Sequence, residues 1–261
     1  MTEPGLAIST PSAPEPAALA RSVVWRGITE TLRPPAGSAE GILPPLMILL
    51  TMVSGIVDAV AYLGLGHVFV ANMTGNVVFL GFSAAGARGL STSGSLLALA
   101  CFLPGGIVAG RLAGRLGESP LPQLRAATGA QVVLCAAAIA TVAADRIDST
   151  SRNVLIALLA LAMGVQNATA RRLAVADLTT TVLTLTLTGI AADSRLAGGS
   201  GTRTGRRLLA VVSMALGALI GAVFVLKVDL VAPLALAGAI LATVCIASHL
   251  AATKHRPASS L

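Results

Sequence analysis

Two stretches of this chain decide its fold: residues 68–86, VFVANMTGNVVFLGFSAAG, and residues 178–192, LTTTVLTLTLTGIAA. Both are apolar overall, yet the first gathers Asn, Thr and Gly between positions 72 and 76. The second has a hydroxyl group at almost every second position. Polar side chains are costly in a bilayer unless they meet each other, a cavity or a ligand. The two stretches are therefore the predicted functional site.

The composition of the rest of the chain predicts a membrane protein. The 261 residues are 55% hydrophobic and 11% charged, with a mean hydropathy of +0.85, whereas soluble domains are about 25% charged. A helix needs about 20 apolar residues to cross a bilayer. Six segments meet this requirement, so we predict an all-α, polytopic transmembrane bundle. They are residues 44–65, 94–112, 126–144, 154–173, 207–226 and 230–250.

The topology depends on whether the two polar stretches cross the membrane. If they do, there are eight spans, and 12 of the 18 Lys and Arg residues lie in the cytoplasm. If both are short or broken, six full spans remain and 14 of the 18 are cytoplasmic, which fits the positive-inside rule better. The stretch 178–192 would also reach only about 22 Å as a helix. We therefore favour six spans plus two partial ones, with eight spans as the alternative.

The termini are expected to be tails on the cytoplasmic side of a bacterial inner membrane. Residues 1–42 contain Pro, Ser, Ala and scattered charges, which favours a disordered tail. Residues 18–33, with Trp25, are also compatible with a short interfacial helix. The transmembrane domain would then cover residues 43–251, followed by a C-terminal tail at 252–261.

The order of features in the chain repeats, which predicts two related halves at residues 43–145 and 153–251. Each half has a long segment with Gly and, three residues later, Asp58 or Asn167. A polar segment, an Arg-containing loop, a Gly-spaced helix and an Ala/Val/Leu helix follow in each. Glycines four residues apart share a helix face and let helices approach closely. The row Gly106, Gly110 and Gly114 is therefore assigned to helix packing, although a dimerisation face is an alternative.

Asp58 is the acid that lies deepest in an apolar segment. It is expected to face the bundle interior, where it would either couple transport to protons or cations, bind a substrate amine, or pair with the NMTGN backbone. Tyr62 lies one turn later on the same face and is a candidate hydrogen-bond partner. Asn72, Thr74 and Asn76 surround Gly75, where the backbone can open. This cluster either binds a ligand or satisfies the backbone at a kink.

A second polar group lies near the end of the fourth long segment, in MGVQNATARR. Gln166 and Asn167 are neutral, and Arg171 shares a helix face with Asn167. Arg171 or the adjacent Arg172 either snorkels to the interface or holds an anionic group, including Asp177. A later acid, Asp193, is expected to pair with Arg195.

No established enzyme or cofactor motif is present, so we expect no catalytic activity, metal or cofactor. The sequence has no HExxH, Walker or GxSxG pattern and no Cys pairs at metal spacing. The net charge of +7 comes mainly from loop arginines, which the positive-inside bias explains without nucleic-acid binding.

Two blocks, GIVDAVAYLGLGHVFVANMTGNVVFLG (55–81) and MGVQNATARRLAVADLTTTVLTLTLTGIAADS (163–194), resemble the signature regions of the YoaK-like bacterial membrane proteins. The domain of that family is catalogued as one of unknown function. The resemblance spans roughly residues 44–250 and implies an integral inner-membrane protein with several helices. It supplies no substrate.

The favoured function is a small secondary transporter or permease for a small polar or ionic solute, with proton coupling as one option. The alternative is a non-transporting accessory or assembly protein that binds partners through its Gly faces. The expected partners are the lipid bilayer and the solute, and a homo-oligomer is compatible with the Gly rows. The predicted substrate or ion ligands are Asp58, Tyr62, Asn72, Thr74, Gly75, Asn76, Gln166, Asn167, Arg171, Asp177, Thr179, Thr180 and Thr181.

Overall fold

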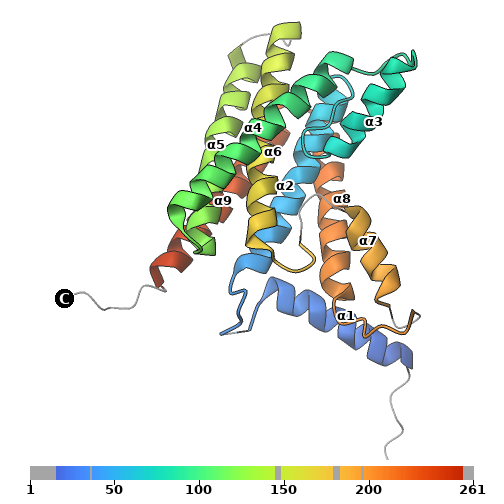
Figure 1. The fold of residues 1–261 in the computed structure, drawn as a ribbon, viewed down its shortest axis with the longest axis vertical. Coiled ribbons are helices and arrows are strands. Elements are labelled where there is room, and N and C mark those ends of the chain that lie inside the picture. Colours follow the sequence, from blue (N-terminus) through green and yellow to red (C-terminus); the bar gives the residue numbers. More distant parts are fainter. Residues whose placement is uncertain (1–15, 36, 145–147, 179–182, 195–196, 255–261) are drawn as a thin grey trace, which may run out of the picture.

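Every regular element in the described part of the chain is an α-helix (Figure 1). The structure is a computed structural model and describes residues 16–35, 37–144, 148–178, 183–194 and 197–254. The helices in these ranges are α1 (Pro16–Leu32), α2 (Leu43–Gly64), α3 (Met73–Ala84), α4 (Thr92–Leu116), α5 (Pro120–Ala144), α6 (Ser149–Leu173), α7 (Leu183–Ala192), α8 (Thr204–Lys227) and α9 (Val231–Lys254).

Six of the described helices, α2, α4, α5, α6, α8 and α9, are long and apolar enough to cross a membrane. The predicted polytopic helical bundle is thereby confirmed. The two polar stretches form the short helices α3 and α7, of 12 and 10 residues. At 1.5 Å per residue they are about 18 and 15 Å long, less than the roughly 30 Å of hydrocarbon. Neither is long enough to be a full span.

Helices α2 and α6 form the centre of the bundle. The most apolar stretches of α2 and α6 are 78% and 61% buried, whereas those of the other four long helices are 22–33% buried. Helix α2 packs against α8 and α9, and α6 packs against α4 and α5. The outer helices expose large apolar side chains such as Leu103, Val133 and Leu219, which suits contact with lipid tails.

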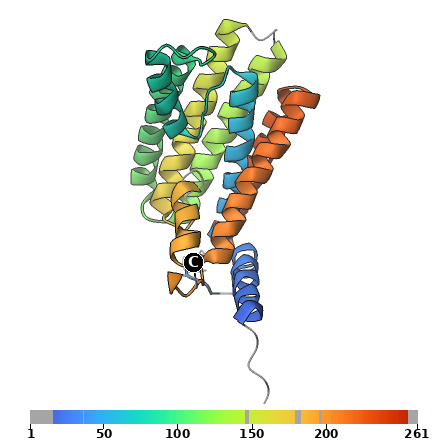
Figure 2. The same cartoon turned by 90° about the vertical axis from the view of Figure 1, so that its right-hand side faces the viewer.

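The short helices lie on the same side of the bundle, with α3 above α7 in both views (Figures 1 and 2). Helix α3 packs against α4, and α7 packs against α8. The chain reaches α3 through residues 65–72, which follow the end of α2. In these views, the two short helices occupy the upper and lower parts of this side.

Glycine contacts bring the backbones of two helix pairs together. A Cβ atom on Gly217 of α8 would meet the carbonyl oxygen of Met52 in α2, and Gly55 of α2 faces α8 in the same way. In the other pair, Gly164 of α6 lies against Gly105 of α4. The absence of a side chain at these positions allows the close crossings.

The Gly106, Gly110 and Gly114 row does not pack as its spacing predicts. Nothing lies within 4 Å of a Cβ atom built on Gly110 or Gly114, and Gly106 meets only the Cβ of Ala168, at 3.9 Å. The close contact is made instead by Gly105, one position earlier. The spacing identifies a face of small residues. Because Gly105 and Gly106 are adjacent, it does not determine which of the two contacts α6.

Residues 16–32 form helix α1, although the composition favours a disordered tail. Helix α1 lies across the end of the bundle, beneath α8 (Figure 1), and contacts α8 and α2. Its Gly27 approaches Gly205, its Thr31 is fully buried, and Trp25 is 62% exposed on the outer side. The interfacial-helix alternative therefore describes this segment better, because Gly205 provides a docking surface that the local sequence does not contain.

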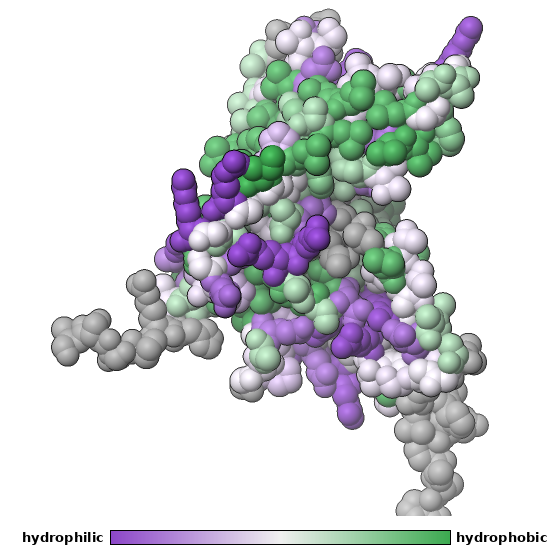
Figure 3. Space-filling model, viewed as in Figure 1, coloured by the Kyte–Doolittle hydropathy of each residue, from purple (hydrophilic) through white to green (hydrophobic). Residues whose placement is uncertain are grey.

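Basic residues gather at one end of the bundle, where α4 and α6 end and α8 begins; we call it the basic end. Hydrophilic residues concentrate in the lower half of the space-filling view, whereas hydrophobic residues cover much of its upper half (Figure 3). The arginines of this end are Arg115, Arg171, Arg172, Arg203, Arg206 and Arg207.

Replacement of Gly105 by Ala is expected to destabilise the protein, because the new Cβ would collide with the backbone of α6. Overpacking of this kind costs about 1–3 kcal/mol. Gly110→Ala in the same helix is the matched control, since the space beside it is open. Thermal unfolding of the purified protein in detergent should give a lower melting temperature for Gly105→Ala alone. Equal melting temperatures for the two variants would contradict the assigned crossing.

Candidate functional site

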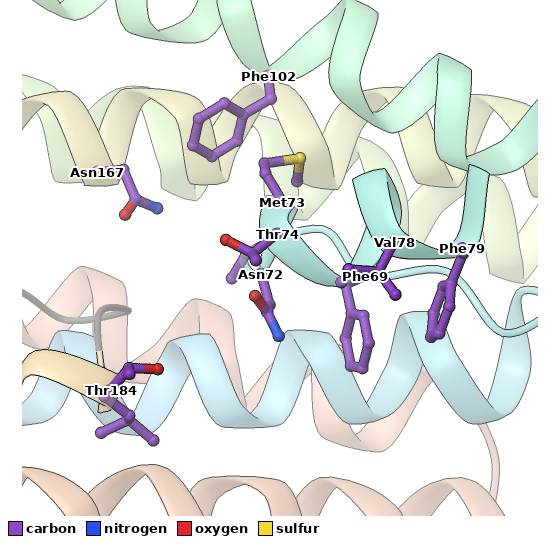
Figure 4. Close-up of a pocket in the computed structure, with 12 residues that line it drawn as sticks. Phe69, Asn72, Met73, Thr74, Val78, Phe79, Phe102, Asn167 and Thr184 are labelled. Carbon is purple, nitrogen blue, oxygen red and sulfur yellow. The ribbon is translucent and has the colours of Figure 1, made fainter. Parts of the chain in front are cut away.

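The start of α3 and the first described residues of α7 line a common cavity of about 530 Å³ (Figure 4). Polar groups reach it from three helices and the loop before α3: Asn72, Thr74, Asn167 and Thr184. Apolar walls come from Phe69, Val78, Phe79 and Phe102, among others. Because the first N–H groups of a helix carry partial positive charge, the start of α3 makes this cavity a favourable place for electronegative groups.

Asp58 holds the loop that leads into α3. Its Oδ1 atom accepts hydrogen bonds from the backbone N–H groups of Val70, at 2.9 Å, and Ala71, at 2.7 Å. The carboxylate is only 6% exposed. Buried N–H groups need such partners, and an ionised acceptor makes stronger bonds than a neutral one. Asp58 therefore satisfies the buried backbone of the loop before α3.

Asn76 fixes the same loop from the other side. Its side chain accepts from the N–H of Phe69 at 2.9 Å and donates to the carbonyl of Phe69 at 2.7 Å. The backbone of Phe69 therefore binds both the oxygen and the nitrogen of the Asn76 amide. Asn76 is fully buried. Gly75 allows this arrangement, because a Cβ there would lie 2.7 Å from the Phe69 ring.

Tyr62 takes part in an aromatic cluster at the same loop. Its ring stacks on Phe69, with centroids 5.1 Å apart, and meets His67 edge-on at 5.0 Å. Phe79 of α3 stacks in turn on Phe69. His67 has a left-handed backbone with φ of 58°, and follows Gly66 with φ of 97°. These two residues turn the chain back into the bundle after α2.

Arg207 belongs to α8 and holds α7 in place. The sequence did not predict this role. Its guanidinium binds Asp177, at 2.8 Å, and Asp193, at 2.7 Å, and also donates to the carbonyl of Gly189. The Arg207 side chain is 8% exposed. It thereby connects the chain before α7 with the end of α7. The expected Asp193 pair with Arg195 involves a residue outside the described part of the chain.

Seven of the predicted site residues belong to one of two groups. Asn72, Thr74, Gly75 and Asn167 line the cavity, whereas Asp58, Tyr62 and Asn76 support its walls. Asp177 pairs with Arg207 and Arg203. Arg171 lines a neighbouring cavity. Thr179, Thr180 and Thr181 lie outside the described residues.

Gln166 connects the two central helices. Its Nε2 atom donates to the carbonyl of Leu50, at 3.1 Å, and to the hydroxyl of Ser54, at 2.8 Å, both on α2. The neighbouring Asn167 points to a different face and donates to the carbonyl of Met163. The adjacent amides thus have different roles: Gln166 joins helices, and Asn167 lines the cavity.

Phe102 is a cavity residue that the sequence did not single out, whereas Thr184 belongs to the hydroxyl-rich stretch 178–192 but was not among the predicted ligands. Phe102 lies in an ordinary apolar segment, and Thr184 is one of many threonines in its stretch. In the described part of the chain, no group of three or more His, Cys, Asp or Glu side chains lies close enough to hold a metal ion. The ligands available in the cavity are therefore amides, hydroxyls and backbone groups.

Comparison with known proteins places the chain among membrane proteins. The family model described as "Protein of unknown function (DUF1275)" matches residues 46–247. The UPF0700 transmembrane protein YoaK of Bacillus subtilis (strain 168) is 35% identical over 148 residues, which are 57% of this chain. The match covers 65% of YoaK, slightly less than two thirds of its length. No solved structure matches the chain.

Asp58→Ala is expected to destabilise the loop before α3. It leaves the N–H groups of Val70 and Ala71 buried without an acceptor, at about 1–3 kcal/mol for each. Hydrogen exchange of residues 66–72 should then accelerate, together with a lower melting temperature. Asp58→Asn keeps an acceptor oxygen and should have a smaller effect. If Asp58→Ala exchanged as slowly as wild type, this role would be incorrect.

The Arg207–Asp177 pair is expected to contribute more to stability than the Arg206–Glu40 pair nearby. The first pair has side chains 8% and 13% exposed, whereas the second has 21% and 33%. A double-mutant cycle with Arg207→Gln and Asp177→Asn should give a coupling energy of about 1–3 kcal/mol in unfolding by SDS. The matched cycle with Arg206→Gln and Glu40→Gln should stay below about 1 kcal/mol. A larger coupling energy for Arg206–Glu40 than for Arg207–Asp177 would contradict this role of Arg207.

Proposed function

The chain belongs to the DUF1275 family of membrane proteins, and we propose that it is a small secondary transporter or permease for a small polar or ionic solute. One observation carries this proposal: the short helices α3 and α7 both line the same polar cavity in a bundle of long apolar helices. Interrupted helices that meet near the middle of the membrane are a common way to build a transporter binding site.

The cavity has a size and a lining suited to a small solute. Its volume of about 530 Å³ lies within the range of small-molecule sites. Asn72, Thr74, Asn167 and Thr184 offer amide and hydroxyl groups to a ligand. Polar side chains are expensive in lipid, so their convergence on one cavity favours a water-filled site. The aromatic and aliphatic walls would limit the size of the bound solute.

Asp58 supports the cavity wall in this proposal. Its Oδ1 atom is occupied by two backbone N–H groups, so direct binding of a solute amine would compete with both. Proton coupling at Asp58 would act through the loop, because protonation removes negative charge from the acceptor of Val70 and Ala71. The proposed direct ligands are therefore the neutral groups, and Asp58 positions them.

We further propose that the two halves are related by an inverted repeat in the inner membrane, with both termini in the cytoplasm. Helices α2 and α8 cross at Gly55 and Gly217, and α6 and α4 cross at Gly164 and Gly105. These pairings are reciprocal between the halves. The arginine content of the basic end supports its cytoplasmic placement under the positive-inside rule.

One observation favours the accessory-protein alternative. Gly110 and Gly114 have open space beside them on an outer helix, where a second copy of this chain or another membrane helix could approach closely. This alternative predicts that Gly110→Leu impairs function and Thr74→Leu does not. The transporter proposal predicts the opposite, because Thr74 lines the cavity.

Water should reach the cavity if the protein transports a polar solute. In a variant lacking Cys101, Cys135 and Cys245, a cysteine at Thr74 or Thr184 is expected to react with a small, charged thiol reagent. Leu219→Cys is the control, because Leu219 is 59% exposed on the lipid-facing side of α8 and should stay unreactive. Liposomes that contain the protein should take up glycerol or potassium nitrate faster than liposomes without protein. Unreactive cysteines at both cavity positions, together with the absence of flux of either solute, would refute the proposal.

A further inference from the structure

Three cavities follow one another from the candidate site to the basic end. A second cavity of about 600 Å³ shares Phe102 and Asn167 with the first, which makes them adjacent. A third cavity, of about 530 Å³, shares Ala174 and Val175 with the second. The shared residues make the three cavities neighbours, in a row from the candidate site to the end of the bundle where α4 and α6 end.

The end of α6 lies where the second and third cavities meet. Ala174 has a left-handed backbone with φ of 49° and terminates the helix. This conformation is unusual for a residue with a Cβ atom. The chain turns away at the point where another turn of α6 would continue along the second and third cavities. Ala174 and Val175 also line both of these cavities.

Arg171 is the charged side chain on this path between the candidate site and its outer mouth. It lines the second cavity, and it lies one helical turn after Asn167, so the two share a face. No charged side chain is among the described residues that line the first cavity. The third cavity has Arg172, Glu118 and Glu40, and Glu40 is paired with Arg206 at 2.8 Å. The third cavity therefore has side chains of both charges. Among the described residues that line the first and second cavities, the charged one is Arg171.

We propose that the three cavities form the access route from the basic end and that Arg171 selects small anions along it. This inference rests on the proposed transport function and assigns a solute class to the same site. A solute that moves from the mouth to Asn167 passes the guanidinium. The guanidinium of Arg171 is exposed, and it lowers the free energy of a nearby anion and raises that of a cation. Phe102 lies between the first and second cavities and forms the wall at their junction.

The selectivity test compares nitrate with glycerol in liposomes that contain the full-length protein. Potassium nitrate flux, with valinomycin to balance charge, and glycerol flux are both followed by stopped-flow light scattering. Arg171→Gln should reduce nitrate flux about tenfold, the loss expected when a charge-assisted contact is removed. Glycerol flux should stay unchanged. Arg171→Lys should keep most of the nitrate flux, because the positive charge remains.

Arg115→Gln is the matched control, since it removes the same charge at the same end of the bundle and Arg115 lines none of the three cavities. It should leave both fluxes unchanged. Nitrate flux that is equal in wild type and Arg171→Gln, with glycerol flux intact, would overturn the anion selectivity and leave transport standing. An absence of flux for both solutes in the wild type would overturn the transport function and, with it, this inference.

A second measurement tests the route itself. In the cysteine-free variant, Ala168→Cys in the second cavity should react with a bulky, charged thiol reagent, and the reaction should block flux of both solutes. Gly110→Cys, on the open face of α4, is the control and should not change flux after the same treatment. Unchanged flux after complete labelling at position 168 would show that solute does not pass this cavity.

Discussion

Every backbone N–H and C=O group of this protein that lies at membrane depth needs a partner from the protein itself or from water in a cavity. Long helices meet this requirement internally, but the chain leaves helical geometry after α2 and again after α6. At the first interruption, Asp58 and Asn76 bind the backbone of residues 69–71. At the second, Arg207 connects Asp177 with α7. These contacts hold the loop before α3 and the helix α7 in place, and both line the cavity.

The two interruptions are stabilised by opposite charges. A carboxylate accepts backbone N–H groups before α3, whereas a guanidinium donates to a backbone carbonyl and two carboxylates around α7. Each charge is thereby used by the protein structure, because leaving a buried charge or N–H group without a partner would be costly. The described lining of the cavity has neutral side chains and the start of α3. Its electrostatic preference depends on this helix start and on the charge in the neighbouring cavity, Arg171.

The sequence predicted the helical bundle because this fold depends on local composition, and the location of the site stays a prediction. Apolar length located the six spans, and the Asn, Thr and Gly residues between positions 72 and 76 located the start of α3. Neither Arg207 nor Gly105 could be found this way. An arginine near the start of a span normally snorkels to the interface, and the partners of Arg207 lie 30 and 14 positions away. The contact of Gly105 depends on the rotation of α4 against α6, which two adjacent glycines leave open.

The role of each predicted polar residue depended on its direction, which sequence spacing gives only within one helix. On α6, successive residues are about 100° apart, so Gly164, Gln166 and Asn167 point to three different faces. Gly164 packs on α4, Gln166 binds α2, and Asn167 faces the cavity. The first two contacts prevent α6 from rotating, since rotation would separate the Gln166 hydrogen bonds and push a larger residue toward Gly105. The position of Asn167 in the cavity, and of Arg171 one turn later, therefore follows from packing on the other two faces.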